Sequence, residues 1–442
     1  MLTINNLHPY QQKIIQKSKD MPHMGLLMDM GLGKTITTLS IIKGKTLIIA
    51  PKAVAKNVWM QEAKNWEHTQ KVKFALLVGT VKERESALQE NADVYLINVE
   101  NVVWLVDQKI LPKWDSLVID ESSRFKNPGS KRWKSLKKIL GTFKYRYILT
   151  GTPTPKSYLD LWTQIAILDL GQRLGTTMTA FKEKYFDPDQ RDRRTGVVWS
   201  WKLKPNAKES IDAKIADVCF SLRAEDYLTM PRRQDVTHAI EWDRKGRDVY
   251  KQMKKDMVVE ISNDVLTAVS AGVLTNKLLQ ITSGQVYNEQ REVVDVHTEK
   301  LDYLTEMVED APTLIFYAYK HSLERLKKAL PDAVELKPDD TGTITAWREG
   351  KISQLICHPK SVGIGLNLQC NVGDTAQVVW FDLPWSGEDY LQANARVFRQ
   401  GQTKPVIVHH LTMASSIDGQ VMDVLQGKID TQEALMNALK LQ

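Results

Sequence analysis

The sequence contains little cysteine and lacks the patterns of disulfide-rich, metal-binding and membrane-spanning proteins. Only Cys219, Cys357 and Cys370 occur in 442 residues, and their wide spacing fits neither a disulfide framework nor a set of metal ligands. No apolar run approaches the roughly 18 residues of a membrane span, and the polar start "MLTINNLHPYQQK" is not a signal peptide. We therefore expect a soluble intracellular protein with no membrane partner, cytoplasmic in a prokaryote or virus and nuclear in a eukaryote.

Composition and charge leave most globular functions open. Hydrophobic residues make up 43% and charged residues 26% of the chain, which is typical of folded domains rather than disorder. A chain of 442 residues is too long for one hydrophobic core and predicts two or three domains. The formal net charge of +7 is compatible with a nucleic-acid partner, but many proteins without such a partner are equally basic. The nine histidines form no H-E-x-x-H pattern, and we interpret His409 and His410 as strand residues rather than metal ligands.

Short apolar segments alternate with amphipathic segments of helical length in two separate regions. This alternation predicts an α/β protein with two doubly wound, mainly parallel sheets. Between about Pro155 and Val296 the rhythm is lost, and the intervening sequence looks mainly helical. The predicted strands lie in "KTLIIAP" (45–51), "DVYLIN" (93–98), "DSLVIDE" (115–121) and "YRYILTGTP" (145–153), and then in "PTLIFYA" (312–318), "QLICHP" (354–359), "AQVVWFDLP" (376–384) and "KPVIVHHL" (404–411).

The stretch "MDMGLGKT" (28–35) predicts a phosphate-binding loop, although the first glycine of the full P-loop pattern is replaced by Met28. Lys34 can reach the β- and γ-phosphates, and the Thr35 hydroxyl can bind Mg²⁺. Gly31 and Gly33 allow backbone N–H groups to turn toward anionic oxygens. The loop follows a predicted strand, "MGLLM" (24–28), and precedes a helix and a strand from about Thr46 to Ala50. This context favours a working site over a chance Gly-Lys-Thr.

Two further groups of residues fit phosphoryl transfer. Asp120 and Glu121 end a predicted strand, where a doubly wound sheet presents its ligands, although an isolated Asp-Glu pair is more often a helix cap. Asp120 can hold Mg²⁺ and Glu121 can activate the attacking water. Arg396 and Arg399 are three residues apart, which predicts one face of a helix, and they suit a γ-phosphate. By themselves they would equally fit a solvated helix face.

Taken together, the motifs resemble those of superfamily 2 helicase-type ATPases, and most of all those of the SWI/SNF-like DNA translocases. "MDMGLGKT" resembles their "DEMGLGKT", which also lacks the first glycine, and "DESSRFKN" resembles "DEAHRIKN". Similar pairs are "LTGTPTP" with "LTGTPLQN", "KSVGIGLNL" with "KAGGLGINL", and "QANARVFRQGQ" with "QAxDRAHRIGQ". "LHPYQQ" resembles the adenine-reading Q motif, and "FSLRAEDYLTMP" resembles the segment that links the lobes. The motifs run in family order from residue 7 to residue 402.

The resemblance implies two RecA-like lobes with helical insertions between them. Residues 1–228 would form the ATP-binding lobe with one insertion, and 229–442 the helicase lobe with an insertion near its start. ATP and Mg²⁺ are the implied cofactors. The implied ATP contacts are Tyr10, Gln11, Met30, Gly31, Leu32, Gly33, Lys34, Thr35, Ile36 and Gly365, with Thr35 and Asp120 as metal ligands and Lys34, Asp120, Glu121, Arg396 and Arg399 as catalytic residues.

The resemblance also implies that loops at strand ends contact the backbone of a DNA duplex. The candidates carried over by position are Pro51, Lys52, Asn98, Lys126, Asn127, Gly151, Thr152, Ser361 and Trp385. The cluster Arg191, Arg193 and Arg194 beside Trp199 and Trp201 could clamp DNA or simply pack. Three departures concern coupling of hydrolysis to movement: Ser123 replaces the usual histidine, Pro155-Lys156 replaces Gln-Asn, and Val362 replaces a glycine.

We therefore expect an ATP-dependent translocase or remodeller of double-stranded DNA. The alternatives are a helicase that separates DNA or RNA strands and a recruitment module with a vestigial ATPase. A nuclease, suggested by "VELK" (334–337), lacks an identifiable acidic partner, and this segment fits a strand better. No reader or zinc module is visible beside the motor, which suggests either a prokaryotic or viral protein or one that takes its targeting from a protein partner. Single-stranded nucleic acid is a second candidate ligand.

Overall fold

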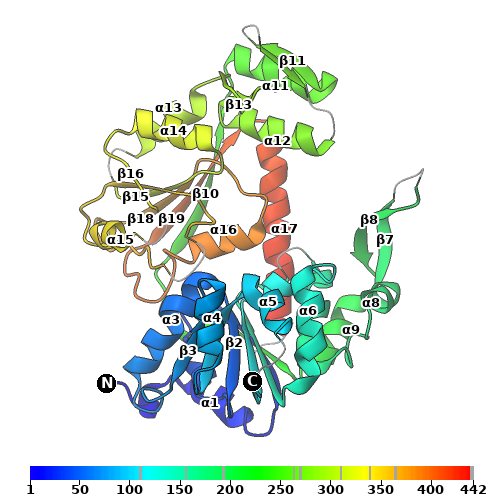
Figure 1. The fold of residues 1–442 in the computed structure, drawn as a ribbon. Coiled ribbons are helices and arrows are strands. Elements are labelled where there is room, and N and C mark those ends of the chain that lie inside the picture. Colours follow the sequence, from blue (N-terminus) through cyan, green and yellow to red (C-terminus); the bar gives the residue numbers. More distant parts are fainter. Residues whose placement is uncertain are drawn as a thin grey trace. The chain divides into compact units, whose positions relative to one another are not determined.

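The computed structural model describes residues 1–108, 112–154, 157–191, 195–261, 264–267, 271–308, 311–337, 340–362 and 366–438 (Figure 1). The chain divides into unit 1, Met1–Leu228 with the segment from Lys428 onward, and unit 2, Thr229–Gly427. Each unit is built on its own sheet. None of the described helices is both long and apolar enough to span a membrane.

Unit 1 contains a seven-stranded sheet in the order β3-β4-β2-β5-β6-β1-β9. All neighbouring strands in it run parallel. Each strand is short and almost wholly buried, as expected for a parallel sheet covered on both faces. The strands are β1 (His23–Met28), β2 (Thr46–Ala50), β3 (Phe74–Leu77), β4 (Val94–Asn98), β5 (Ser116–Asp120), β6 (Tyr145–Thr150) and β9 (Cys219–Leu222).

Helices cover both faces of this sheet (Figure 1). Neighbouring strand residues alternate between two buried clusters: Leu26 belongs to the one formed with α1, α2 and α3, and Leu27 to the one formed with α4, α5, α6 and α7. This two-residue period is the geometry of a strand with both faces buried. The helices of unit 1 are α1 (Pro9–Lys17), α2 (Lys34–Leu39), α3 (Lys52–Asn65), α4 (Val81–Leu88), α5 (Val102–Val106), α6 (Lys131–Ile139), α7 (Leu161–Asp169), α8 (Met178–Tyr185), α9 (Ala207–Ile215) and α10 (Ala224–Tyr227).

The insertion that precedes β9 contains α8, α9 and an antiparallel hairpin, β7 (Phe186–Arg191) with β8 (Val198–Leu203). The hairpin projects away from the sheet in Figure 1. Trp201 packs against the core beside α4–α7, and the Lys182 ammonium lies 4.7 Å from its ring centroid. Of the predicted cluster, Trp201 therefore packs and Arg191 is exposed, whereas Arg193 and Arg194 lie outside the described residues.

Unit 2 contains a six-stranded parallel sheet in the order β10-β19-β18-β15-β17-β16. The two sheets confirm the predicted α/β architecture, and every strand expected from an apolar segment is present. The strands of the sheet are β10 (Arg233–Ile240), β15 (Thr313–Phe316), β16 (Val334–Glu335), β17 (Gln354–Cys357), β18 (Ala376–Trp380) and β19 (Val406–Met413). His409 and His410 lie in β19, as expected.

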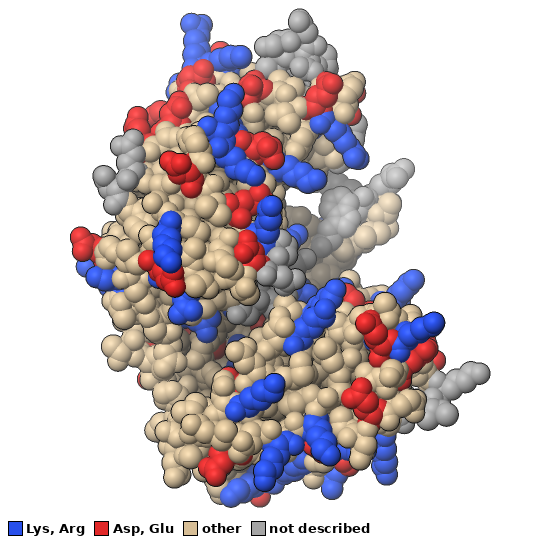
Figure 2. Space-filling model, turned by 60° about the vertical axis from the view of Figure 1, so that its left-hand side comes forward, with Lys and Arg blue, Asp and Glu red and all other residues tan. Residues whose placement is uncertain are grey.

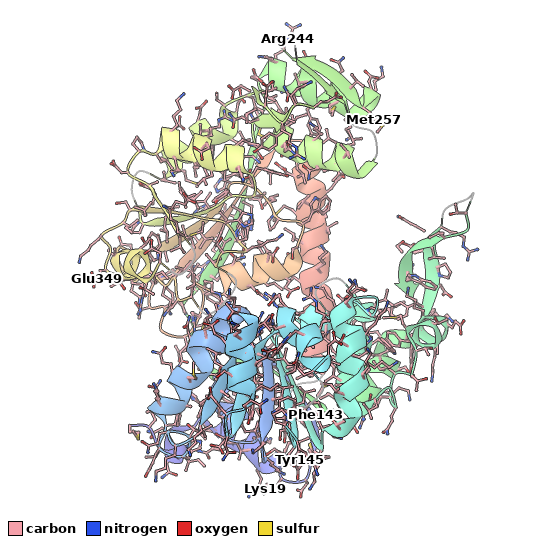
Figure 3. All side chains as sticks on the ribbon, in the orientation of Figure 1. Lys19, Phe143, Tyr145, Arg244, Met257 and Glu349 are labelled. Atoms are coloured by element: carbon pink, nitrogen blue, oxygen red, sulfur yellow. The ribbon has the colours of Figure 1, made fainter. Side chains whose placement is uncertain are left out.

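The helices of unit 2 and two hairpins complete the described chain. The segment between β10 and α13 forms the insertion near the start of this unit, and in Figure 3 Arg244 and Met257 mark the two ends of α11 at its outer edge. The elements are α11 (Arg244–Asp256), β11 (Val258–Ile261), β12 (Asp264–Thr267), α12 (Ala271–Thr282), β13 (Gln285–Tyr287), β14 (Val293–Asp295), α13 (Glu299–Met307), α14 (Lys320–Ala329), α15 (Thr341–Arg348), α16 (Gly387–Asn394) and α17 (Ile417–Ala438). The residues of α17 from Lys428 onward belong to unit 1.

The amino end of the unit 1 sheet is closed by local packing. Lys19, Phe143 and Tyr145 lie together at this end in Figure 3, and Tyr145 is the first residue of β6. The Lys43 ammonium donates to the Ser18 carbonyl over 3.3 Å and lies 4.9 Å from the Tyr145 ring centroid. The loops that carry the predicted site all leave the opposite, carboxyl end of the sheet.

Candidate functional site

The predicted phosphate loop and the predicted carboxylates lie at the carboxyl ends of neighbouring strands in the unit 1 sheet. Strands β5, β6 and β1 are direct neighbours, and they end at Asp120, Thr150 and Met28. Their register pairs Asp120 with Leu149, and Thr150 with Leu27. Because parallel strands end on the same side, the loops that follow all three meet there.

The loop after β1 requires glycine at two positions. Gly31 has φ 87° and Gly33 has φ 70°, a left-handed conformation that other residues adopt only with strain. A Cβ on Gly33 would also lie 2.5 Å from Nε2 of Gln11. The loop can therefore adopt this conformation without strain only because positions 31 and 33 are glycine.

Lys34 begins α2 directly after this loop. Its ammonium donates to the Met28 carbonyl over 2.8 Å and forms no ion pair with any described residue. Gly151, which follows β6, is close by: a Cβ there would lie 3.2 Å from the Met28 oxygen and 3.7 Å from the Lys34 nitrogen. The ammonium is thus positioned by a neutral carbonyl, and its charge remains available for an anionic ligand.

Tyr10 and Gln11 of α1 are attached to the same loop. The Tyr10 hydroxyl donates to the Leu32 carbonyl over 3.2 Å, and Nε2 of Gln11 lies within 3.5 Å of the Leu32 and Gly33 carbonyls. The Tyr10 ring packs against Tyr227 of α10 with 4.8 Å between centroids. The structure therefore brings the predicted base-reading residues to the phosphate loop. Tyr227 was not predicted, and its only signal was its place in the linking segment.

Asp29 fastens the loop to the end of unit 1. Its Oδ2 accepts a hydrogen bond from the Ala224 backbone over 2.9 Å, and its own N–H donates to the Leu222 carbonyl over 2.9 Å. Burial raises the pKa of this carboxyl. Asp29 lies inside the quoted motif, yet the sequence assigned it no role.

Asp120 and Glu121 are adjacent carboxylates in an unusual environment. Asp120 is 7% exposed, and its Oδ2 accepts a hydrogen bond from Nε1 of Trp59 over 3.1 Å. Burial, with a contribution from the charge of Glu121, raises the pKa of Asp120 to about 7, although Lys34 opposes the shift. Glu121 has φ 59°, a strained value for a non-glycine residue, and its Oε2 lies 3.5 Å from the Thr150 hydroxyl.

These residues fit a magnesium ion. A buried carboxylate beside a second carboxylate is stabilised in its ionised form by a divalent cation. The described residues contain no cluster of three His, Cys, Asp or Glu side chains that could hold a metal alone. Mg²⁺ usually takes one or two protein groups together with waters and substrate phosphates. Asp120 and the Thr35 hydroxyl are the predicted ligands.

A buried hydrogen-bond bridge joins the loop after β5 to the loop after β6. The Ser122 hydroxyl donates to Oε1 of Gln164 over 2.7 Å, and Nε2 of Gln164 donates to the Pro153 carbonyl over 2.7 Å. Gln164 is 1% exposed and lies on α7. We call this connection the Ser122–Gln164 bridge. The sequence indicated only the two loops, because Gln164 belongs to neither motif.

Arg396 and Arg399 lie in unit 2, and the helix predicted for them is wrong. α16 ends at Asn394, and the Arg396 carbonyl accepts a hydrogen bond from Leu368 over 3.0 Å instead of continuing the helix. Arg399 donates from Nη1 to the Leu366 carbonyl over 3.5 Å, and its buried Nε has no partner among the described residues. Burial, reinforced by Arg348, lowers the pKa of Arg399.

The predicted nucleic-acid contacts lie at or after the carboxyl ends of strands in their own units: Asn98 is the last residue of β4, and the others follow a strand. Lys52 and Asn127 are exposed and Trp385 is 44% exposed, whereas Gly151 and Thr152 are buried against the phosphate loop. Acidic and basic side chains are mixed over the face shown in Figure 2, so charge alone does not outline a DNA site on that face. The remaining candidates are Pro51, Asn98, Lys126 and Ser361, and their roles stay predictions; Gly365 and Pro155-Lys156 lie outside the described residues.

Comparisons with known proteins agree with the motifs. Protein p41 of Acyrthosiphon pisum secondary endosymbiont phage 1 is 34% identical over 98% of both chains. The Mycoplasma genitalium protein named "Uncharacterized ATP-dependent helicase MG018" is 25% identical over 96% of this chain, which spans 42% of that protein. A solved structure, the Sulfolobus solfataricus SWI2/SNF2 ATPase core in complex with dsDNA, covers 98% of this chain and is itself covered to 94%, at 21% identity and a TM-score of 0.44.

The family itself is established by a match over most of the sequence. Residues 10–291 match the family described as "SNF2-related domain". This range begins at Tyr10 in α1 and ends in the turn between β13 and β14 of unit 2. Two parallel α/β sheets accompany that match. The chain therefore belongs to the SNF2-related family of helicase-like, ATP-dependent proteins.

Proposed function

We propose that this chain is an ATP-dependent translocase or remodeller of double-stranded DNA. The observation that carries the proposal is that Lys34, Asp120 and Glu121 come together at the carboxyl ends of neighbouring strands in the unit 1 sheet. Gly33 and Gly151 allow the close packing of the loops there. Family membership supports ATP use. The likeness of the motifs to those of SWI/SNF-like DNA translocases favours duplex DNA as the polymer on which the chain acts.

In this proposal, the unit 1 residues divide the work of ATP hydrolysis. Lys34 and the N–H groups of the loop bind the β- and γ-phosphates, and Tyr10 and Gln11 orient the base. Glu121 takes a proton from water as the water oxygen bonds to the γ-phosphorus and the bond to the ADP oxygen breaks. Mg²⁺, held by Asp120 and Thr35, would neutralise part of the phosphate charge.

The arginines of unit 2 would act in the same reaction. Arg396 and Arg399 carry guanidinium groups suited to the charge that spreads over the γ-phosphate oxygens in the transition state. Arg399 already holds a partly buried charge with one nitrogen unpartnered among the described residues, and a phosphate would satisfy it. We propose that they reach the phosphate in a closed state, and that opening after hydrolysis produces a step along DNA.

DNA stimulation of hydrolysis tests the proposal directly. We expect duplex DNA to raise the ATPase rate more than single-stranded DNA or RNA, with little dependence on sequence and a steep loss with salt, because a stepping motor contacts phosphates. Displacement of a triplex strand would report movement, and a fluorescent forked duplex would report unwinding. Fork opening without triplex displacement, or stimulation by RNA alone, would establish the strand-separating helicase instead.

Two substitutions separate binding from chemistry within the same assay. Lys34→Ala should weaken nucleotide binding, whereas Glu121→Gln should preserve binding and stop turnover. A Glu121→Gln protein that still hydrolyses ATP would exclude Glu121 as the base. An unchanged number of bound ATP molecules per chain in Lys34→Ala would exclude the phosphate loop as a nucleotide site. A wild-type protein that does not hydrolyse ATP would favour the recruitment module.

A further inference from the structure

Unit 2 contains a cavity that the ATPase site does not use. Its volume is about 830 Å³, and it is formed by α14, the β13–β14 hairpin, α11 and the start of α13. All its lining residues belong to unit 2, whereas the phosphate loop belongs to unit 1. A cavity of this size accommodates a ligand as large as a nucleotide.

The cavity has an excess of positive charge that lacks internal partners. Four cations line it: Lys245, Lys320, Arg325 and Lys328, against two carboxylates, Asp295 and Glu324. None of the four forms an ion pair with a described residue. Arg325 donates to the Ser283 carbonyl over 3.2 Å and to the His297 carbonyl over 2.5 Å, so both of these hydrogen bonds go to neutral oxygens. Burial lowers the pKa of Arg325 and outweighs the nearby carboxylates that raise it, of which Asp295 contributes most. A concave surface with this charge suits an anion.

The floor of the cavity adds flat rings and unsatisfied polar atoms. The His321 ring is 3% exposed, stacks on Tyr319 at 5.1 Å and meets Tyr287 edge-on at 4.9 Å. Its Nε2 is buried and has no partner among the described residues, and the same holds for Oε1 of Gln285. Buried polar atoms without partners are costly, which points to a ligand that supplies both a donor and an acceptor.

We propose that this cavity binds a nucleoside phosphate. A nucleobase offers a flat face for Tyr287 and both kinds of hydrogen-bonding group for Gln285 and His321, while phosphate oxygens would meet Lys320 and Lys328. An acidic peptide would pair with the lysines, but its side chains would neither stack on the Tyr287 ring nor supply hydrogen-bond partners to Gln285 and His321 as well as a nucleobase does. The nucleoside phosphate can be a free nucleotide or the phosphorylated end of a single strand.

The test measures binding in the full chain with the phosphate loop disabled by Lys34→Ala. The probes are a fluorescent N-methylanthraniloyl ADP for free nucleotide and a fluorescein-labelled, 5′-phosphorylated (dT)10 for a strand end. The double variant Lys320→Ala with Lys328→Ala should lower the affinity for the probe that the cavity binds by roughly tenfold or more. Lys327→Ala is the control for loss of one lysine from the same helix, to be compared also with Lys320→Ala and Lys328→Ala made singly; Lys327 lies on α14 but pairs with Glu335 at 3.2 Å.

A second variant examines the base rather than the phosphate. Tyr287→Leu should weaken N-methylanthraniloyl ADP several-fold and leave competition by inorganic tripolyphosphate unchanged. If the Lys320 and Lys328 double variant loses binding of the ADP probe alone, the cavity binds free nucleotides. If it loses binding of the oligonucleotide alone, the cavity binds strand ends. The proposal is overturned if neither probe responds more to the Lys320 and Lys328 pair than to Lys327→Ala, or if only an oligoglutamate peptide binds with that sensitivity. Hydrolysis assays in the Lys34-intact chain test the proposed function separately.

Discussion

Removal of the Ser122–Gln164 bridge should loosen the two loops that carry the proposed chemistry. Gln164→Leu keeps the side-chain volume but deletes the acceptor for the Ser122 hydroxyl and the donor for the Pro153 and Asp160 carbonyls, which bond Nε2 at 2.7 and 2.8 Å. Ser122 is fully buried, so water cannot replace the lost partner.

The magnitude follows from the three groups left unsatisfied. Each buried polar group without a partner costs about 1–3 kcal/mol, and the two carbonyls retain part of their other interactions, so we expect a total of about 3 kcal/mol. Ser122→Ala alone should cost about 1 kcal/mol, because it strands only Oε1 of Gln164. The double variant should cost less than the sum, by about 1 kcal/mol, since the shared bond can be lost only once.

Hydrogen–deuterium exchange measures this effect within unit 1. Peptides from Ser116–Phe125 and Tyr145–Thr154 report opening of β5, β6 and their loops, and a loss of about 3 kcal/mol would accelerate their exchange by roughly 100-fold. Peptides from β10 in unit 2 are the internal control. Unchanged exchange in the Gln164→Leu protein, or strictly additive single variants, would refute the bridge as a stabilising connection.

Three further changes follow from the same geometry. Gly33→Ala should reduce fluorescent-ATP affinity by roughly tenfold or more, because φ 70° is strained for alanine and its Cβ would meet Gln11; unchanged affinity would contradict this loop conformation. Arg399→Ala should lower the ATP hydrolysis rate by roughly 10³-fold with little change in ATP affinity, and near-normal turnover would exclude it as a catalytic residue. Burial raises the pKa of Asp212 to about 6, so between about pH 4 and 6 the folded state retains a proton that the unfolded state loses. The protonated carboxyl therefore stabilises the fold at low pH, and this contribution to the free energy of unfolding is lost as pH rises through about 6. The stability of Asp212→Asn relative to the parent should therefore rise by roughly 2 kcal/mol between about pH 4 and pH 8, measured from thermal midpoints, and a constant difference would refute the buried carboxyl.

The parallel sheets were predictable because their central strands are buried on both faces. "TLIIA" in β2 and "SLVID" in β5 are continuous apolar runs, and such runs remain visible in a single sequence. The turn after β1 was also predictable, since Gly31 and Gly33 have the left-handed backbone conformations that the motif favours, while phosphate binding there stays a prediction. Edge strand β10, "RQDVTHAI", was missed because one side of it is exposed and its residues are largely polar.

Long-range side-chain contacts account for what the sequence could not provide. Ser122 and Gln164 are brought together only by the packing of α7 against the sheet, and Trp59 reaches Asp120 from a helix that lies far earlier in the chain. The helix predicted across Arg396 ends early because its carbonyl bonds to Leu368 in another segment. Local periodicity contains no information about such competing partners.

The position of β9 has a consequence for the newly made chain. β1 leaves the ribosome before the other strands of the unit 1 sheet, yet one of its two neighbours is β9, the last strand of that sheet along the chain. Asp29 bonds to Ala224, which lies beyond β9. At roughly 5–20 residues per second, the apolar edge "HMGLLM" stays unpaired for on the order of ten seconds. Until then Asp29 lacks its partners Leu222 and Ala224, so a nascent fragment that stops before Cys219 cannot complete the proposed nucleotide site. Such a fragment presents an open strand edge, which makes it a natural client for chaperones and proteases.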